Sequence, residues 1–316
     1  MQISPRQPKS QFDFGAAITQ LFNTPGGARW ALKLVFWTGL LLAAIYVIGG
    51  ALIAAPYLSM IENIEDPEAI LDNFWAMIPG YLIMTFGALF ALAIGETTLH
   101  RAVLLNEDTP GLIPLRFGKQ ELRVFGASLG VWLLALGAFI GVIFIAAIIA
   151  GIISVAVPSI GIILILIAYL AGLFIWPFVA IKLSPAAALS VYNDRAHLLA
   201  GRHISKYRFW SLFLGFLFIG FVGYVLSMVI TLTGMTALIG DSSLFVVSSG
   251  EFGDGDGADI AQTFRDKFSS PLVVIGSIIF MLIYSCFVAA WLLSMAGVGS
   301  YAVKWWAEED QVSPFD

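Results

Sequence analysis

Residues 123–182 read RVFGASLGVWLLALGAFIGVIFIAAIIAGIISVAVPSIGIILILIAYLAGLFIWPFVAIK, with no charged residue between Arg123 and Lys182. A helix rises about 1.5 Å per residue, so one crossing of a hydrocarbon layer about 30 Å thick needs about 20 apolar residues. The stretch is long enough for two crossings and therefore predicts a helical hairpin. Proline disfavours helix at the residue before it and glycine loosens a turn, which places the break at 157–161. We predict spans at about 124–155 and 161–181.

Four further uncharged runs flank this hairpin, at about 32–55, 74–94, 209–232 and 272–298, the first of them stopping before Pro56. Of the 316 residues, 59% are hydrophobic and 12% are charged, and the mean hydropathy is +0.91. Soluble domains carry about 25% charged residues. We predict an all-α polytopic membrane protein with six transmembrane helices. Residues 30–306 would form one membrane domain, between a cytoplasmic N-terminal segment (1–29) and a cytoplasmic tail (307–316).

The positions of lysine and arginine predict the orientation, because positive residues in short loops set topology. Of the 16 Lys and Arg residues, 14 lie in the N-terminal segment with the foot of the first span, the second-to-third and fourth-to-fifth linkers, and the C-terminal end. Only Arg265 and Lys267 lie in the opposite loops, among many acidic residues. Both termini are therefore expected to be cytoplasmic.

Three similar junctions suggest a threefold internal repeat. Arg29, Arg123 and Arg208 each stand at the start of an odd-numbered span with an aromatic residue just inside, as expected for a snorkelling cation and an interfacial ring. A polar-apolar segment precedes each junction, at 12–22, 97–122 and 185–199. We predict that these segments form cytoplasmic interfacial amphipathic helices around the hairpins, the last with Ser184 as N-cap and Gly201 just after its end.

Glycines in the third span form a narrow stripe on one helix face, namely Gly126, Gly130, Gly137, Gly141 and Gly151. Small residues let helices approach closely in lipid. We favour packing of another span of the same chain against this stripe, and a homodimer face is the alternative.

Glu96, His100 and Arg101 bring ionisable groups to the end of the second span, with Glu96 and His100 four residues apart on one helix face. An intramembrane ionisable group is a functional candidate because its desolvation is costly. Glu96 lies on the cytoplasmic side, where it can pair with His100, Arg101 or an arginine of a neighbouring repeat. We favour such a structural ion pair over a proton relay or a metal site, since two potential ligands are too few for a metal.

The cytoplasmic linkers also carry cations suited to lipid headgroups or to a protein partner. These candidate contacts are Arg123, Arg195, Arg202, Lys206 and Arg208. The same charges are required by topology alone, which is the competing interpretation.

The acidic run Asp254–Asp259 resembles a calcium loop superficially, but Arg265 stands where the twelfth-position glutamate belongs. We expect a solvated loop; whether it binds a cation stays open.

Cys286 is the one cysteine, so a disulfide within the chain and a cysteine metal cage are excluded. No phosphate loop, catalytic triad or zinc motif occurs, so no cofactor, metal site or catalytic residue is expected. No basic cluster indicates nucleic acid as a partner.

The segment 177–214, PFVAIKLSPAAALSVYNDRAHLLAGRHISKYRFWSLFL, resembles a pattern in uncharacterised proteobacterial inner-membrane proteins related to the membrane domain of some glycerophosphodiester phosphodiesterases. The matching residues are Pro185, Ala186, Ala187, Arg208, Phe209 and Trp210, and the segment 96–123 with its Leu115-Arg116-Phe117-Gly118 is also similar. The resemblance implies a six-span domain in the bacterial inner membrane. It implies no hydrolase activity, because the soluble phosphodiesterase domain with its His-Arg motif is absent from this sequence.

These observations favour a non-enzymatic accessory or scaffold subunit that binds membrane lipids, another membrane protein complex, or both. A small transporter or channel is the alternative, and a membrane enzyme of lipid metabolism is the third possibility. The ligand and the oligomeric state do not follow from the sequence.

Overall fold

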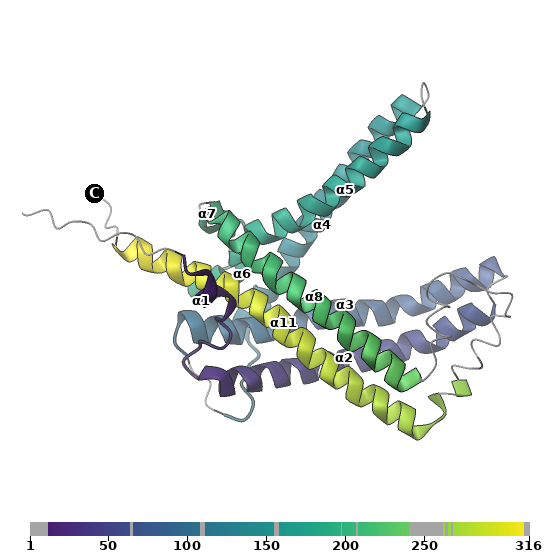
Figure 1. The fold of residues 1–316 in the computed structure, drawn as a ribbon, viewed down its shortest axis with the longest axis horizontal. Helices are drawn as coiled ribbons and strands as arrows, with labels where there is room; N and C mark the ends of the chain where they lie inside the picture. Colours follow the sequence, from purple (N-terminus) through teal and green to yellow (C-terminus); the bar gives the residue numbers. More distant parts are fainter. Residues whose placement is uncertain are drawn as a thin grey trace, which may run out of the picture.

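The computed structural model describes residues 12–63, 66–107, 111–154, 158–196, 198–206, 208–239, 262, 265–266 and 268–312. Within these ranges all regular structure is helical, and six helices are long and apolar enough to cross a membrane (Figure 1). The long helices are α2 (Gly27–Glu62), α3 (Pro67–Leu104), α4 (Lys119–Ser154), α5 (Pro158–Leu183), α8 (Phe209–Ile239) and α11 (Pro271–Val312). The predicted all-α fold with six such helices is confirmed.

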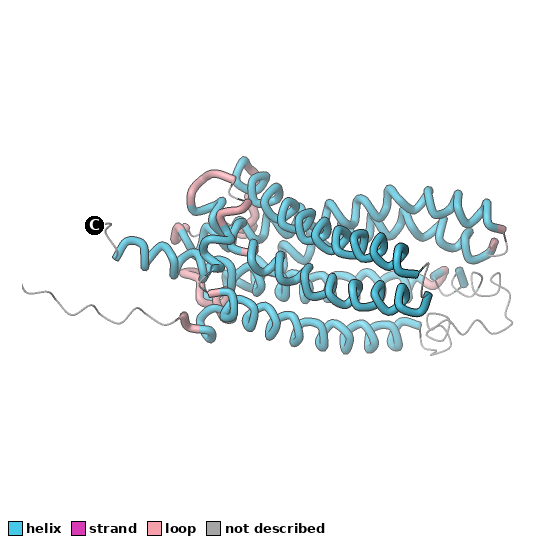
Figure 2. The backbone as a smooth tube through the Cα atoms, turned by 90° about the horizontal axis from the view of Figure 1, so that it is seen from above, coloured by secondary structure: helices cyan, strands magenta, loops and turns pink. Residues whose placement is uncertain are grey.

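The long helices form three hairpins, α2–α3, α4–α5 and α8–α11. Three short helices, α1 (Phe14–Ile18), α6 (Pro185–Tyr192) and α7 (Gly201–Lys206), gather at one end with the segments 19–26 and 111–118 (Figure 2). We call this end the collar. The long helices all extend from the collar toward the opposite end of the view in Figure 2.

Local sequence explains where the helices start and why one passes its expected end. Asp66 accepts hydrogen bonds from the backbone N–H groups of Glu68 and Ala69, and Pro67 occupies the first turn, so α3 begins there. Pro158 likewise starts α5 within the predicted break. The helix α2 does not stop before Pro56, as the sequence had suggested, but continues to Glu62. Helices in membrane-spanning bundles accommodate proline because the backbone groups it frees find other partners.

The main core joins α2, α3 and α11. Leu34, Leu42, Leu99 and Leu293 are fully buried in one cluster. The backbones of α2 and α11 lie close together at Gly39 of α2, where an added Cβ would stand 2.6 Å from the Cα of Cys286. Two helix backbones can come this close only where one residue has no side chain.

Glycines also hold α8 against α11. An added Cβ at Gly223 would overlap the indole of Trp291, and one at Gly234 would overlap the ring of Phe280. Large side chains of α11 thus fill hollows that the glycines leave in α8, the close packing that associates helices in lipid.

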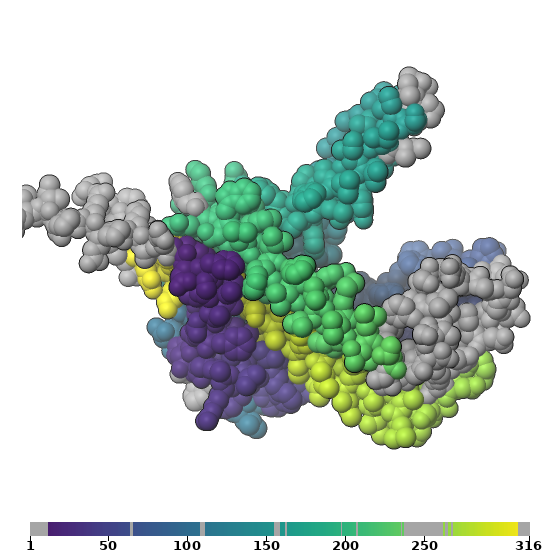
Figure 3. Space-filling model, in the orientation of Figure 1, coloured from purple at the N-terminus to yellow at the C-terminus, as the bar shows by residue number. Residues whose placement is uncertain are grey.

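The α4–α5 hairpin stands apart from the other four long helices (Figures 1 and 3). Its side-chain contacts with other long helices include Phe125 with Phe90 and Phe178 with Phe209, both close to the collar. Farther along the hairpin, apolar side chains such as Phe144 and Ile152 are exposed. The hairpin therefore leaves a long apolar surface uncovered by the described parts of this chain.

The short helices differ from the predicted interfacial ones. Residues Pro185–Val191 of α6 are all buried, with Ala187 and Val191 packed against Ala93 and Val124, so α6 is a packed element of the collar. In the segment 97–122, α3 runs on to Leu104 and α4 starts at Lys119, with no separate helix in the described residues between them. A helix–hairpin repeat used three times stays a prediction, although the three hairpins themselves are present.

Candidate functional site

A polar network in the collar fastens α4 to α3. Arg101 of α3 forms an ion pair with Glu121 of α4 at 3.0 Å, and its Nε donates a hydrogen bond of 2.6 Å to Gln120 Oε1. The Glu121 side chain is 0% exposed and lies in the first turn of α4, where the helix dipole favours a negative charge. Neither carboxylate oxygen of Glu121 has an aligned hydrogen bond in the described structure, so Arg101 is the charge that compensates it.

Asp194 extends the network to the end of α6. Its φ of 51° is left-handed, a conformation that Asp and Asn adopt more readily than most residues. Its carboxylate accepts a hydrogen bond of 3.1 Å from Gln120 and pairs with Arg123, which also donates to the Asp194 carbonyl at 2.6 Å. The hydrogen bond from Gln120, with the charge and hydrogen bond of Arg123, outweighs partial desolvation and lowers the pKa of Asp194 below its ordinary 3.8.

The candidate ion pair of Glu96, His100 and Arg101 is replaced by three separate contacts. Arg101 pairs with Glu121, as above. His100, which is buried, shares a hydrogen bond of 2.7 Å with Ser300 of α11. Glu96 accepts a hydrogen bond of 3.2 Å from Ser128 of α4. Arg101 and Glu96 therefore both contact α4, whereas His100 contacts α11.

The five candidate cations fall into two groups. Arg195, Arg202 and Lys206 are exposed on the collar. Arg123 is bound to Asp194, and Arg208 lies 4.2 Å from the ring centre of Trp305, with its Nε buried. Arg123 and Arg208 therefore hold collar elements together, while the other three face outward.

The glycine stripe of α4 is mostly open. An added Cβ at Gly126, Gly137 or Gly141 would meet nothing within 4 Å, whereas at Gly130 it would meet Leu198 at 3.0 Å. The favoured packing of another span of this chain against the stripe is therefore not seen at Gly126, Gly137 or Gly141 among the described residues. Of these four glycines, only Gly130 has another side chain, that of Leu198, in close contact.

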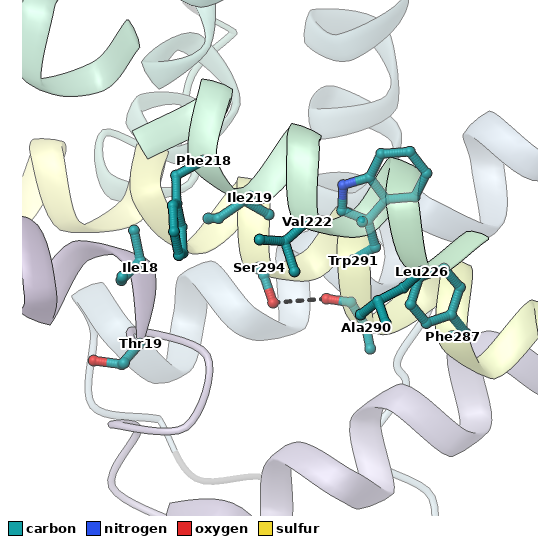
Figure 4. A pocket seen from close by; sticks show the side chains of 11 residues that line it. Ile18, Thr19, Phe218, Ile219, Val222, Leu226, Phe287, Ala290, Trp291 and Ser294 are labelled. Carbon is teal, nitrogen blue, oxygen red and sulfur yellow. Dashed lines mark hydrogen bonds between the residues drawn. The ribbon is translucent and has the colours of Figure 1, made fainter. Parts of the chain in front are cut away.

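An apolar groove of about 250 Å³ lies between α8 and α11 below α1 (Figure 4). Figure 4 shows Phe218, Val222 and Trp291 among its walls. Its two hydroxyls bond to their own backbone, since Ser294 donates to Ala290 at 2.7 Å and Thr19 donates to Gly15 at 2.8 Å. The groove therefore offers mainly apolar contact, although the indole Nε1 of Trp291 is a buried donor with no hydrogen-bond acceptor in the described structure.

Sequence reasoning missed Glu121, Asp194, Ser128 and Ser300. Glu121 gave a signal, because it is an acid in the first turn before a span and next to a basic linker. The others have partners 32 to 200 residues away, as in the contacts of Ser128 with Glu96 and of Ser300 with His100. Only the tertiary fold reveals such pairs.

Among the described residues, no three His, Cys, Asp or Glu side chains lie close enough together to hold a metal ion. The acidic run Asp254–Asp259 lies outside the described residues. Comparisons with protein-family models, with curated proteins and with solved structures give no match to this chain. The resemblance to phosphodiesterase membrane domains therefore stays a prediction.

Proposed function

We propose that this chain is a non-enzymatic accessory or scaffold subunit of the bacterial inner membrane that binds lipid and other membrane proteins. The observation that carries the proposal is the α4–α5 hairpin, which is fastened near the collar and leaves its long apolar surface uncovered. In a membrane, lipid or a partner helix covers such a surface. By the distribution of Lys and Arg, the collar faces the cytoplasm.

The open glycines of α4 support a helical partner. Gly137 and Gly141 are spaced by four, the spacing at which small residues let a second helix approach closely. An added Cβ there meets nothing of the described chain within 4 Å, so the space beside these glycines is open to another molecule. That molecule can be a different membrane protein or a second copy of this one.

The test is mild purification from the native membrane, followed by mass spectrometry of everything that stays bound. We expect a stoichiometric partner or a fixed amount of lipid with the unmodified chain. Gly137→Leu with Gly141→Leu should abolish recovery of a partner helix without disturbing the fold. Gly50→Leu on α2 is the matched control, since an added Cβ at Gly50 also meets nothing within 4 Å. Recovery of neither partner nor lipid with the unmodified chain would end the proposal.

Transport by a small channel or carrier is the second candidate, and the contact of Glu96 with Ser128 between α3 and α4 favours it. Acidic groups within spans often mark ion pathways. Liposomes that hold the protein should then pass protons or a solute, and Glu96→Gln should reduce that flux. If liposomes with the unmodified chain and liposomes with Glu96→Gln both show no flux of protons or solute, this candidate is excluded.

A further inference from the structure

Three helices converge where the α4–α5 hairpin meets α8. The Ser205 hydroxyl of α7 donates a hydrogen bond of 2.7 Å to the carbonyl of Lys182 near the end of α5. At the other end of α7, an added Cβ at Gly201 would stand 3.0 Å from the Leu183 carbonyl. The rings of Phe178 and Phe209, 4.8 Å apart, join α5 to α8. We call this convergence the α5–α7–α8 junction.

The junction is basic. The Lys182 ammonium lies 5.1 Å from the ring centre of Phe178, and Arg202 is exposed in the first turn of α7. Between residues 159 and 240 the sequence has one acid, Asp194, and its carboxylate already pairs with Arg123. Cations without nearby acids on the same segment give a local positive potential, which attracts anions.

Below the cations the surface is apolar on both sides. Phe174 of α5 is 76% exposed, and Trp210 of α8 is 71% exposed, followed along α8 by exposed Leu214 and Leu217. Figure 3 shows α5 and α8 diverging from the collar with open space between them. This order matches one leaflet of a bilayer. The cations lie at the level of the headgroups, the aromatic ring lies at the interface, and the apolar side chains lie at the level of the acyl chains.

We propose that the α5–α7–α8 junction binds an anionic phospholipid. Its phosphate would lie at Lys182 and Arg202, and its acyl chains would lie between α5 and α8 against Phe174 and Leu217. Charge complementarity selects an anionic headgroup, and the adjoining apolar walls select a lipid over a soluble phosphate. The inference rests on the proposed function and names the lipid class and its site.

The test uses the purified full chain in detergent, titrated with phosphatidylglycerol that carries brominated acyl chains. Bromine quenches nearby tryptophan, so we expect quenching at a lower mole fraction than with brominated phosphatidylcholine. Trp210→Phe should remove a large part of the quenching, which locates the lipid. Soluble glycerol phosphate should fail to displace the lipid; displacement would assign the site to free phosphate and overturn the proposal.

Variants that remove the charges of Lys182 and Arg202 test whether these residues bind the headgroup. Lys182→Gln with Arg202→Gln should reduce the preference for phosphatidylglycerol, by about 5-fold for each cation removed. Arg202→Gln alone should reduce the preference for phosphatidylglycerol by about 5-fold. Because Arg202 is exposed, this variant should fold and can replace the double variant if that one fails to fold. Arg116→Gln with Lys119→Gln makes the same charge change elsewhere on the collar and should retain the preference.

An unchanged preference in Arg202→Gln, or an equal loss in the control, would overturn the proposed site. If native purification still recovers a partner or lipid in that case, the proposed function stands and the site alone is wrong. If the unmodified chain shows no preference and also comes out of the membrane with neither lipid nor partner, both proposals fail.

Discussion

Removing the arginine that compensates Glu121 should destabilise the collar. In Arg101→Met the Glu121 carboxylate stays fully buried and loses its counter-charge. Breaking a buried pair in this way costs about 3–5 kcal/mol. The Arg101 side chain is 17% exposed, so water screens the pair slightly and we expect the lower end, about 3 kcal/mol.

This free energy converts to a shift in the unfolding midpoint. The entropy of unfolding is about 2.1 cal/mol/K per residue, or about 0.7 kcal/mol/K for a chain of this length, so the midpoint should fall by about 4–5 °C. Cys286 is the one cysteine of the chain, is half-buried and packs against Gly39, so a maleimide dye that fluoresces on reaction with its thiol should react faster as the chain unfolds.

The double variant Arg101→Met with Glu121→Leu tests the reasoning. Replacing both charges of a buried pair by apolar groups is often neutral or stabilising, so the double variant should recover most of the lost stability. Arg116→Met, at an exposed collar position, should shift the midpoint by less than about 1 °C. If the unfolding midpoints of the single and double variants fall by the same amount, the loss of stability does not come from an uncompensated Glu121.

Two further predictions concern the unfolding midpoint. The pH series for Asp194 is followed by tryptophan fluorescence, because a maleimide reacts with the thiolate, which is absent in strong acid; the glycine variants use the thiol assay. Asp194 has a lowered pKa in the folded chain, so its contribution to stability is present above its ordinary value of 3.8 and is lost as the pH falls through the folded value. Asp194→Asn should therefore lower the midpoint at pH 7 and match the unmodified chain in strong acid; a constant difference at every pH would contradict this. Gly39→Ala should cost about 1–3 kcal/mol, because its Cβ would stand 2.6 Å from the Cα of Cys286. Gly50→Ala, whose Cβ meets nothing within 4 Å, should cause no such loss, and equal midpoints for the two variants would argue against a close helix contact.

The long helices follow from sequence because their signal is local. The charge-free run from Arg123 to Lys182 exceeds one crossing, and Pro158 lies where a turn is needed. Burial of α6 does not follow from the same reading. The polar residues 193–195, which suggested an interfacial helix, come after the end of α6 at Tyr192. The helix itself is a short apolar segment that the collar encloses.

For the candidate site, sequence likewise predicts residue type and helix face but not the contacting residues. Helical periodicity identifies the face on which Gly137 and Gly141 lie, but it does not reveal whether this chain fills the space beside them. Charge type likewise marks Arg202 and Arg208 as cations of one linker, while only the fold shows that Arg208 stacks on Trp305. Partner identity for a side chain depends on residues far away in the sequence.

The attachment of the α4–α5 hairpin near the collar makes it a lever. From Arg123 to Ser154, α4 is about 46 Å long at 1.5 Å per residue. A rotation of about 10° at the collar would move the far end by about 8 Å, close to the distance between two packed helix axes. Through this lever arm, a change of a few ångströms in the contacts of Glu121 or Asp194 at one membrane surface becomes a displacement of about 8 Å near the other, about one spacing between packed helices.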